Sequence, residues 1–317
     1  MNQSEFINLH SDFWKESEHR NKSDHSQKID LPATYRILSH HLALAETRNY
    51  SEGLIRYLQS LVLKYHSLLY SYKKNWFAVL WFFFSIKFPG SVRENYKLIY
   101  SASSIFFIPL IITAAITYVF PDIVYYIISI ENIAEIKDMY NPEGSVLGRA
   151  RADEGDWYMF GYYIYNNTSI GFRTFAAGLL MGFGTVFFLV FNAVYIGLIA
   201  GYLINIGYSN TFFSFVSGHS SFELMAIALS GAAGLMLGNA LINPANSKRK
   251  QALRYAAKLA MPVMQGAMSF FFIAAAIEAF WSSNKTIMFE IKIFVGLMFW
   301  LSIVLYFIYS GKNKVVK

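Results

Sequence analysis

The chain of 317 residues contains no cysteine. This absence excludes a disulfide framework, a metal centre held by thiolates and a cysteine nucleophile. Charged residues are also scarce, at 15% of the chain, whereas 55% of the residues are hydrophobic and 18% are aromatic. So small a polar fraction does not cover a soluble globule of this length, and we therefore expect lipid to contact much of the surface.

The sequence motifs of several enzyme classes are missing as well. There is no GxxxxGK[ST] phosphate loop, no GxGxxG fingerprint and no serine nucleophile elbow. The first 28 residues have no apolar stretch of the kind found in a cleaved signal peptide. The formal charge of +7 comes from basic residues that flank apolar stretches, which indicates contact with anionic lipid and not with nucleic acid. We expect a non-enzymatic protein without a cofactor or a metal.

Residues 1–75 predict a cytoplasmic unit of three amphipathic helices. Their apolar stripes recur at helical spacing, and their members are Phe6, Leu9, Phe13 and Trp14, then Tyr35, Leu38, Leu42 and Ala45, then Leu54, Tyr57, Leu58, Leu61 and Tyr65. His40 and His41 are expected on a solvated helix face. Residues 76–97 predict a connector that begins with an interfacial helix, because an apolar run of about 20 Å is too short to cross a bilayer. An ordinary buried helix is the alternative.

Residues 98–311 predict a transmembrane domain with about six embedded segments. The first, residues 98–120, has no charge and a kink at Pro109. Residues 172–206 would form a straight helix of about 50 Å, longer than one crossing needs. We predict a descending span to about Phe191, a turn at Asn192 and a returning arm from Ala193, with one tilted helix as the alternative. Residues 219–241, 261–281 and 291–309 complete the set.

The charges between these segments predict the orientation. Residues 121–171 form the expected extracytoplasmic segment, which contains an aromatic stretch at 157–165 and the acids Asp122, Glu131, Glu135, Asp138, Glu143, Asp153, Glu154 and Asp156. Basic residues follow later spans: Lys248, Arg249, Lys250, Arg254 and Lys258, then Lys312, Lys314 and Lys317. A return within 172–206 places both basic groups on the cytoplasmic side. The sequence thus predicts an all-α, multi-pass protein of the bacterial cytoplasmic membrane with both termini cytoplasmic.

Four ionisable residues fall within or beside the apolar spans: Arg173, His219, Glu223 and Glu278. Burying such groups in hydrocarbon costs several kcal/mol unless they find partners or water. They form either one polar cluster that opens outward or separate residues that reach the headgroups independently. A zinc site is disfavoured, because the sequence HSSFE has no second histidine nearby and differs from HExxH.

Amides and glycines mark further structural positions. Asn166 and Asn167 precede the long apolar run, and Asn192 interrupts it. A buried amide in lipid needs a hydrogen-bond partner, so we expect Asn192 to hold the turn or a facing helix. Glycines at four-residue spacing predict seams of close helix packing, within one chain or between two copies. These are Gly178 with Gly182, Gly197 with Gly201, and Gly234 with Gly238.

Nearly the whole chain resembles the stage II sporulation protein M family. The resemblance is carried by YNPEG at Tyr140, FGYYIYNNTSIGF at Phe160, GLLMGFGTVFFLVFNAVYIG at Gly178 and HSSFELMAIALSGAAGLMLG at His219. The last stretch is similar to a family pattern, with Ser220 where glycine is usual. The resemblance implies a multi-pass protein that anchors cell-wall-degrading enzymes, and the soluble N-terminal part is similar to the stand-alone members found also in bacteria that do not sporulate.

Two functions follow as hypotheses. The first is a membrane scaffold for envelope-remodelling partners, which is consistent with the missing catalytic motifs. The second is a permease, channel or lipid-translocating protein, possibly a dimer, that uses the intramembrane carboxylates. An intramembrane hydrolase that uses His219 and Glu223 is a more distant third. The expected partners are the lipid bilayer, membrane or cell-envelope proteins and a second copy of the chain.

Overall fold

The computed structural model describes residues 1–19, 30–70, 75–144, 147–149 and 155–312. Its regular elements over those residues are helices, without a strand among them. The chain divides into two compact units, Met1–Val79 and Leu80–Lys317. Asp153 and Glu154 of the predicted acidic segment, and Lys314 and Lys317 near the C-terminus, lie outside the described residues.

The first unit is a bundle of helices with its own apolar core. Within residues 1–19 and 30–70 it consists of α1 (Gln3–His19), α2 (Leu31–Thr47) and α3 (Glu52–Tyr70). Asp30 caps α2 by accepting a hydrogen bond from the backbone N–H of Ala33. Apart from Leu9, which is exposed, the core is built from the predicted stripes, and its buried members are Phe6, Trp14, Leu38, Ala45, Leu54, Leu58, Leu61 and Tyr65. The three predicted helices are therefore present.

His41 differs from the prediction. His40 is exposed as expected, but the His41 residue is only 7% exposed. The indole Nε1 of Trp14 donates a hydrogen bond to His41 Nδ1 over 3.0 Å. Helical spacing places His41 on the same face as Leu38 and Ala45, so it lies in the core of the unit.

The connector contains an exposed helix and a buried one, whereas the sequence offered an interfacial helix and a buried helix as alternatives. It contains α4 (Trp76–Phe82), the π-helical turn η1 (Phe83–Lys87) and α5 (Phe88–Glu94). Every residue of α4 is exposed. Phe88 of α5 is instead fully buried, and its ring meets those of Phe270 and Phe307 edge to face. The run thus begins as an exposed apolar helix and ends in the core of the second unit.

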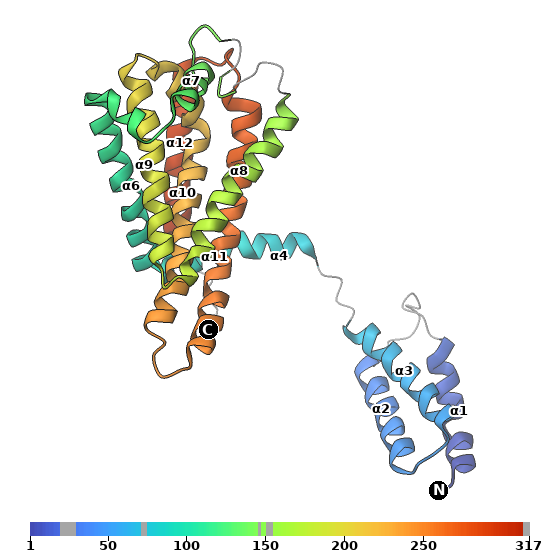
Figure 1. Cartoon of the computed structure of the whole chain (residues 1–317). Coiled ribbons are helices and arrows are strands. Elements are labelled where there is room, and N and C mark those ends of the chain that lie inside the picture. The colour runs from blue at the N-terminus through green and yellow to red at the C-terminus, as the bar shows by residue number, and fades with distance from the viewer. Residues whose placement is uncertain (20–29, 71–74, 145–146, 150–154, 313–317) are drawn as a thin grey trace. The chain divides into compact units, whose positions relative to one another are not determined.

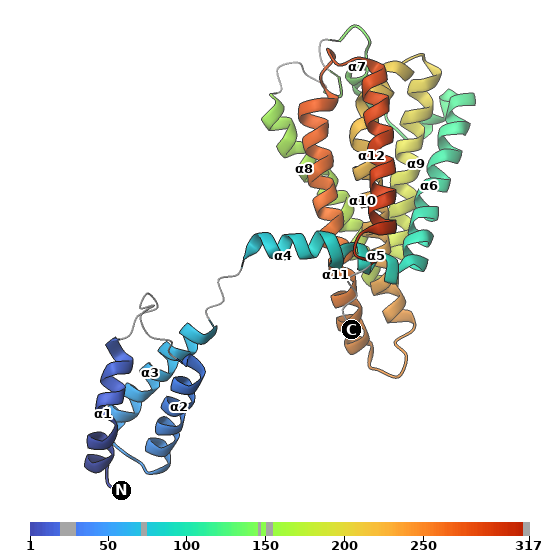
Figure 2. The same ribbon diagram turned by 180° about the vertical axis from the view of Figure 1, so that it is seen from behind.

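In the described part of the second unit, six long helices run side by side (Figures 1 and 2). They are α6 (Tyr96–Val119), α8 (Asp156–Ala176), α9 (Phe183–Asn205), α10 (Ser209–Ile242), α11 (Arg249–Ile277) and α12 (Phe289–Tyr309). In that described part, all of them except α8 are long and apolar enough to span a membrane. The most apolar window of α10 is 67% buried, against 11% for α6 and 17% for α12. The protein is an all-α, multi-pass membrane protein with α10 at its centre.

The helices of this bundle alternate in direction. The start of α6, the turn between α10 and α11 and the end of α12 lie at one end, which we call the basic end because Lys248, Arg249 and Lys250 belong to it (Figure 1). α7 (Ile130–Met139) lies at the opposite end, which we call the acidic end because Glu131 and Glu135 belong to it. Both ends of the bundle's chain therefore emerge on one side, as predicted.

The segment 172–206 does double back, but not at Asn192. The turn lies at Met181 and Gly182, which both have positive φ angles of 53° and 84°. Asn192 lies inside α9, where its side chain donates a hydrogen bond to the carbonyl of Phe188, one turn earlier in the same helix. Because that bond satisfies the amide locally, Asn192 requires no break in the helix.

The descending arm of this turn is α8, which begins at Asp156. The aromatic stretch at 157–165, together with Asn166 and Asn167, was predicted within the extracytoplasmic segment 121–171 and lies in α8, one of the long helices of the bundle. The sequence obscured this because α8 carries too many polar residues to pass as an apolar span.

The glycine pairs lie at close approaches between helices of this one chain. A Cβ on Gly178 would be 2.1 Å from the carbonyl oxygen of Gly234, and one on Gly238 would be 2.4 Å from the backbone nitrogen of Gly182. Added Cβ atoms on α9 would meet α6. A Cβ on Gly197 would be 2.6 Å from the carbonyl oxygen of Leu110, and one on Gly201 would be 2.3 Å from that of Ala114. The seams therefore join α8 and its turn to α10, and α9 to α6.

Candidate functional site

Three ionisable side chains meet inside the bundle, in the half nearer the acidic end. His219 and Glu223 lie one turn apart on α10, and Glu278 begins the π-helical turn η4 (Glu278–Ser282) that continues α11. One ligand atom from each, a ring nitrogen or a carboxylate oxygen, lies within 4.8 Å of the other two. His219 is 4% exposed and Glu278 is 8% exposed, while the side chain of Glu223 is partly buried, at 18% exposed. We call these three residues the buried triad.

The π-helical turn positions the histidine. Ser282, at the end of η4, places its Oγ 3.1 Å from His219 Nδ1. That contact leaves His219 Nε2 facing Glu223, with 3.7 Å between Nε2 and Oε2. The spacing exceeds that of a hydrogen bond, so the imidazole and the carboxylate face each other across a small gap. Single π-turns within helices are frequent at functional sites.

Helix α8 supplies an amide to the same place. Asn167 is buried, and its Nδ2 lies 3.5 Å from Glu278 Oε2, at the limit of a hydrogen bond. Asn166 donates to the Oδ1 of Asn167 over 3.0 Å, which orients that amide toward Glu278. Asn167 thus contacts the turn that continues α11, whereas the amide of Asn192, which was predicted to hold a turn or a facing helix, bonds within α9.

Lys292 of α12 was not identified from the sequence. It is fully buried, and its ammonium donates to the carbonyl oxygen of Ser282 over 2.7 Å and lies 5.8 Å from the ring centre of Trp281. The sequence does contain an indication of its role, because Lys292 lies one residue inside the predicted span 291–309 and a charge there needs a partner. Lys292 thus binds the backbone of η4 and not the carboxylates of the triad.

Arg173 does not join the cluster that was predicted for it. It lies exposed in the last turn of α8, toward the basic end, whereas Glu278 lies near the acidic end of α11. The prediction assumed that the descending span begins at Phe172, which would place Arg173 at the outer surface. Because α8 begins at Asp156, Arg173 lies near its far end.

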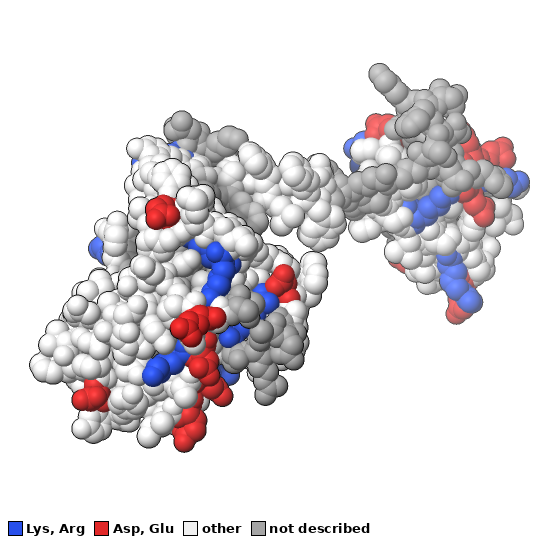
Figure 3. All heavy atoms as spheres, turned by 90° about the horizontal axis from the view of Figure 1, so that it is seen from above, with Lys and Arg blue, Asp and Glu red and all other residues white. Residues whose placement is uncertain are grey.

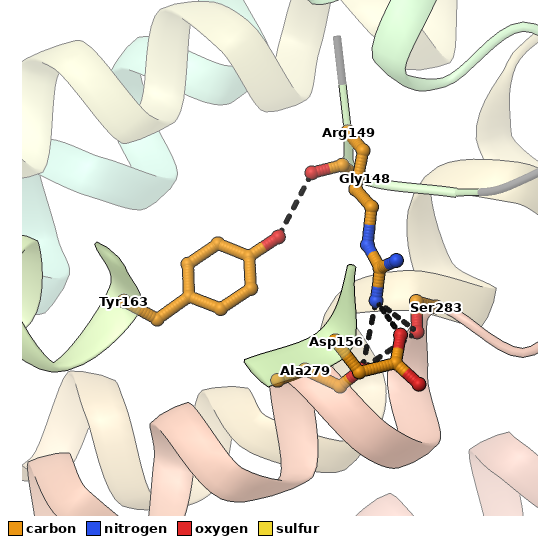
Figure 4. A network of polar contacts seen from close by, with 6 residues as sticks. All are labelled: Gly148, Arg149, Asp156, Tyr163, Ala279 and Ser283. Atoms are coloured by element: carbon orange, nitrogen blue, oxygen red, sulfur yellow. Dashed lines mark hydrogen bonds and ion pairs between the residues drawn. The ribbon is translucent and has the colours of Figure 1, made fainter. Parts of the chain in front are cut away.

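A loop segment covers the triad at the acidic end. We call residues 139–144 and 147–149 the cap. The guanidinium of Arg149 is buried, pairs with Asp156 and donates to the carbonyl oxygen of Ala279 over 3.0 Å and to Ser283 Oγ over 3.3 Å (Figure 4). The hydroxyl of Tyr163 donates to the carbonyl of Gly148 over 2.9 Å. The cap is therefore fastened to both α8 and α11.

Aromatic rings connect the cap to the triad. The ring of Tyr140 packs edge to face on Phe215 at 5.8 Å, and Phe215 packs in the same way on His219 at 5.1 Å. Burial raises the pKa of the Tyr140 hydroxyl, and the charges of Glu278 and Glu223 raise that pKa further. Gly148 has a φ of 73°, and a Cβ there would lie 2.1 Å from the ring of Phe215. These contacts close the site toward the acidic end.

A surface cavity lies elsewhere in the second unit. It has a volume of about 520 Å³ and lies at the basic end, between the start of α6 and the α10–α11 turn. Its polar lining includes Asn95, Asn239, Asn243 and Gln251. It lacks a cluster of ionisable groups among its lining residues, so the buried triad remains the candidate site.

Comparisons with known proteins agree with this division of the chain. The model of the family described as Stage II sporulation protein M matches residues 102–283, and the Domain of unknown function (DUF8413) matches residues 4–71. The searches of curated proteins and of solved structures found no match. The first match covers more than half of the chain and includes the buried triad and the cap. The chain therefore belongs to the stage II sporulation protein M family.

Proposed function

We propose that this membrane protein is a non-enzymatic scaffold that holds envelope-remodelling partners at the bacterial cytoplasmic membrane, with both termini in the cytoplasm. The observation that carries the proposal is the docked acidic segment between α6 and α8. Val124, Ile128 and Ile133 of this segment are buried together with Leu198 and Tyr202. The segment is thus held against the bundle by its own apolar core.

This docking leaves a charged surface available to a partner. Glu131, Glu135 and Asp138 of α7 are all exposed. Figure 3 looks onto this end and shows acidic side chains together with basic ones. A surface that is already fixed binds without the entropy loss of ordering a loop, so it suits a protein whose task is to hold a partner.

The first unit supplies a second binding module. Its independent core and its own family match mark it as a separate domain. The run from Lys248 to Lys258 carries five basic residues and no acid, and the positive-inside rule favours a cytoplasmic position for it. On that basis the N-terminal unit faces the cytoplasm and α7 faces outward.

The missing hydrolytic machinery supports a non-enzymatic role. Ser282, His219 and Glu223 form a line of contacts similar to that of a serine hydrolase, but Ser282 is fully buried. Nδ1 of the histidine, and not Nε2, faces the hydroxyl, and the carboxylate lies 3.7 Å from the ring. In serine hydrolases the nitrogen facing the nucleophile is Nε2. A fluorophosphonate probe should therefore leave Ser282 unlabelled.

Site-specific photo-cross-linking in intact cells tests the scaffold. A photoreactive amino acid at Glu135 should give discrete adducts that mass spectrometry identifies as envelope proteins. The matched control is the same amino acid at Leu301, which is exposed on α12 and should meet lipid. Identical adducts from both positions, or adducts of only abundant bystanders, would contradict the proposal.

The buried triad favours a second candidate, a permease, channel or lipid-translocating protein. Ionisable groups inside a membrane bundle are characteristic of ion and solute pathways. Proteoliposomes should then show a flux that Glu223→Gln and Glu278→Gln both reduce, while Glu290→Gln at the exposed start of α12 leaves it unchanged. A flux that is the same in all three variants would exclude the triad from transport.

A further inference from the structure

We propose that His219, Glu223 and Glu278 bind one divalent transition-metal ion, such as Zn²⁺ or Mn²⁺, inside the bundle. One imidazole and two carboxylates are a ligand set that such ions accept. Three protein ligands leave a further position for water or another small ligand. The site is distinct from the docked acidic surface on which the scaffold proposal rests.

The geometry of the triad is close to that of a metal site. Nitrogen and oxygen ligands bind zinc at about 2.1 Å, so two of them in a tetrahedron lie roughly 3.4 Å apart. The distance between His219 Nε2 and Glu223 Oε2 is 3.7 Å, and the three ligand atoms all lie within 4.8 Å of one another. A small contraction of the two flexible glutamate side chains brings all three ligands into range.

The charges of the triad lack a cationic partner. In the described part of the chain, no Lys or Arg side chain forms an ion pair with Glu223 or Glu278. The ammonium of Lys292 is directed to the carbonyl of Ser282. Two carboxylates close together in an apolar interior repel each other when ionised. A divalent cation between them would neutralise both charges.

The residues around the triad resemble the outer shell of a metal site. When His219 Nδ1 donates its hydrogen to Ser282 Oγ, the lone pair of Nε2 is directed toward the carboxylates. Asn167 contacts Glu278 Oε2 and limits the orientation of that carboxylate. Ligand histidines commonly donate their second N–H in this way, and ligand carboxylates are commonly hydrogen-bonded in turn.

Metal binding by the full-length protein in detergent tests the proposal. The purified protein is stripped with EDTA, exposed to ZnCl₂ or MnCl₂, separated from free metal and measured by inductively coupled plasma mass spectrometry. We expect one ion per chain and an unfolding temperature that rises with the concentration of metal. His219→Gln, Glu223→Gln and Glu278→Gln should each weaken binding by about 10-fold or more. Glu290→Gln, an exposed acid outside the site, should bind as the wild type does.

If a ligand variant does not fold, measurements on the wild-type protein still test the proposal. Its Co²⁺ form should show the visible absorption of a cobalt ion bound by nitrogen and oxygen ligands. Ser282→Ala keeps all three ligands and should bind more weakly than the wild type. Wild-type protein that retains no more metal than a buffer blank would overturn the proposal, as would folded triad variants that bind as well as Glu290→Gln does. The cross-linking of α7 would be unaffected by that failure, so the two proposals fail separately.

Discussion

Gly178 and Gly234 lie backbone against backbone, so close that a Cβ on Gly178 would be 2.1 Å from the carbonyl oxygen of Gly234. Gly178 follows α8 and Gly234 lies in the middle of α10. The contact fixes the depth at which the α8–α9 turn meets the central helix. In lipid, such close approach is a main source of helix association.

Gly178→Ala should therefore destabilise the bundle. The added methyl group meets backbone that cannot rotate away, and overpacking of this kind costs about 1–3 kcal/mol. Thermal unfolding in detergent should show a lower transition temperature. Gly161→Ala on α8 is the matched control, since no other described helix comes within 4 Å of its Cβ position, and its unfolding temperature should not fall. Equal effects of the two substitutions would argue against the seam.

Arg149→Gln should loosen the cap. The guanidinium donates to a buried carbonyl, that of Ala279, and hydrogen bonds from charged groups contribute about 1.5–3 kcal/mol. Amide hydrogen exchange in the cap should accelerate by about 10-fold or more, because 1.4 kcal/mol corresponds to a factor of ten. Lys137→Gln on α7, which is exposed, should leave the exchange unchanged. Slow exchange in both variants would show that other contacts hold the cap.

The stability of the N-terminal unit should depend on pH through His41. Burial, together with the charges of the nearby His10 and His40, lowers the pKa of His41 from 6.5 to about 4. Between these two pH values the unfolded chain binds more protons than the folded chain does. Stability that is present above pH 6.5 is therefore lost as the pH falls toward 4.

Hydrogen exchange over α1 and α2 measures this effect in the full-length protein. Exchange should be faster at pH 4.5 than at pH 7 after correction for the intrinsic rate. His41→Gln removes the titrating group and should reduce that difference, whereas His66→Gln at an exposed position should preserve it. A pH response that is the same in both variants would exclude His41 as its source.

The absence of cysteine makes the orientation directly testable. Single cysteines introduced as Glu135→Cys and Lys250→Cys lie at the acidic and basic ends. In intact cells, a membrane-impermeant maleimide should label the first, and should label the second only after permeabilisation. The reverse pattern would invert the orientation and place the N-terminal unit outside the cytoplasm.

The fold was predictable from the sequence where it depends on local composition. Long apolar runs with few charges identify the helices that are long and apolar enough to span a membrane, and the apolar stripes identify the three helices of the first unit. The position of the turn in 172–206 was not predictable in this way. Met181 and Gly182 break the helix where the chain meets Gly238, and that neighbour is far away in sequence.

The candidate site was predictable only in part, for a related reason. Membership of a polar cluster depends on the depth and the face of each helix, and both are set by packing. His219 and Glu223 share a face because they are four residues apart, so their pairing follows from the sequence. Glu278 meets them because α11 packs on α10 with its last residues beside His219. Arg173 does not, because α8 packs on α10 with Arg173 toward the basic end.

The sequence by itself determined that the protein is embedded in a membrane and that both ends of its bundle lie on one side. These properties follow from the cost of placing charge in hydrocarbon, which each segment carries in its own composition. Only the tertiary structure decided which buried groups meet and what covers them. Those contacts join helices that are distant in sequence, and close packing of glycines and aromatic rings fixes them.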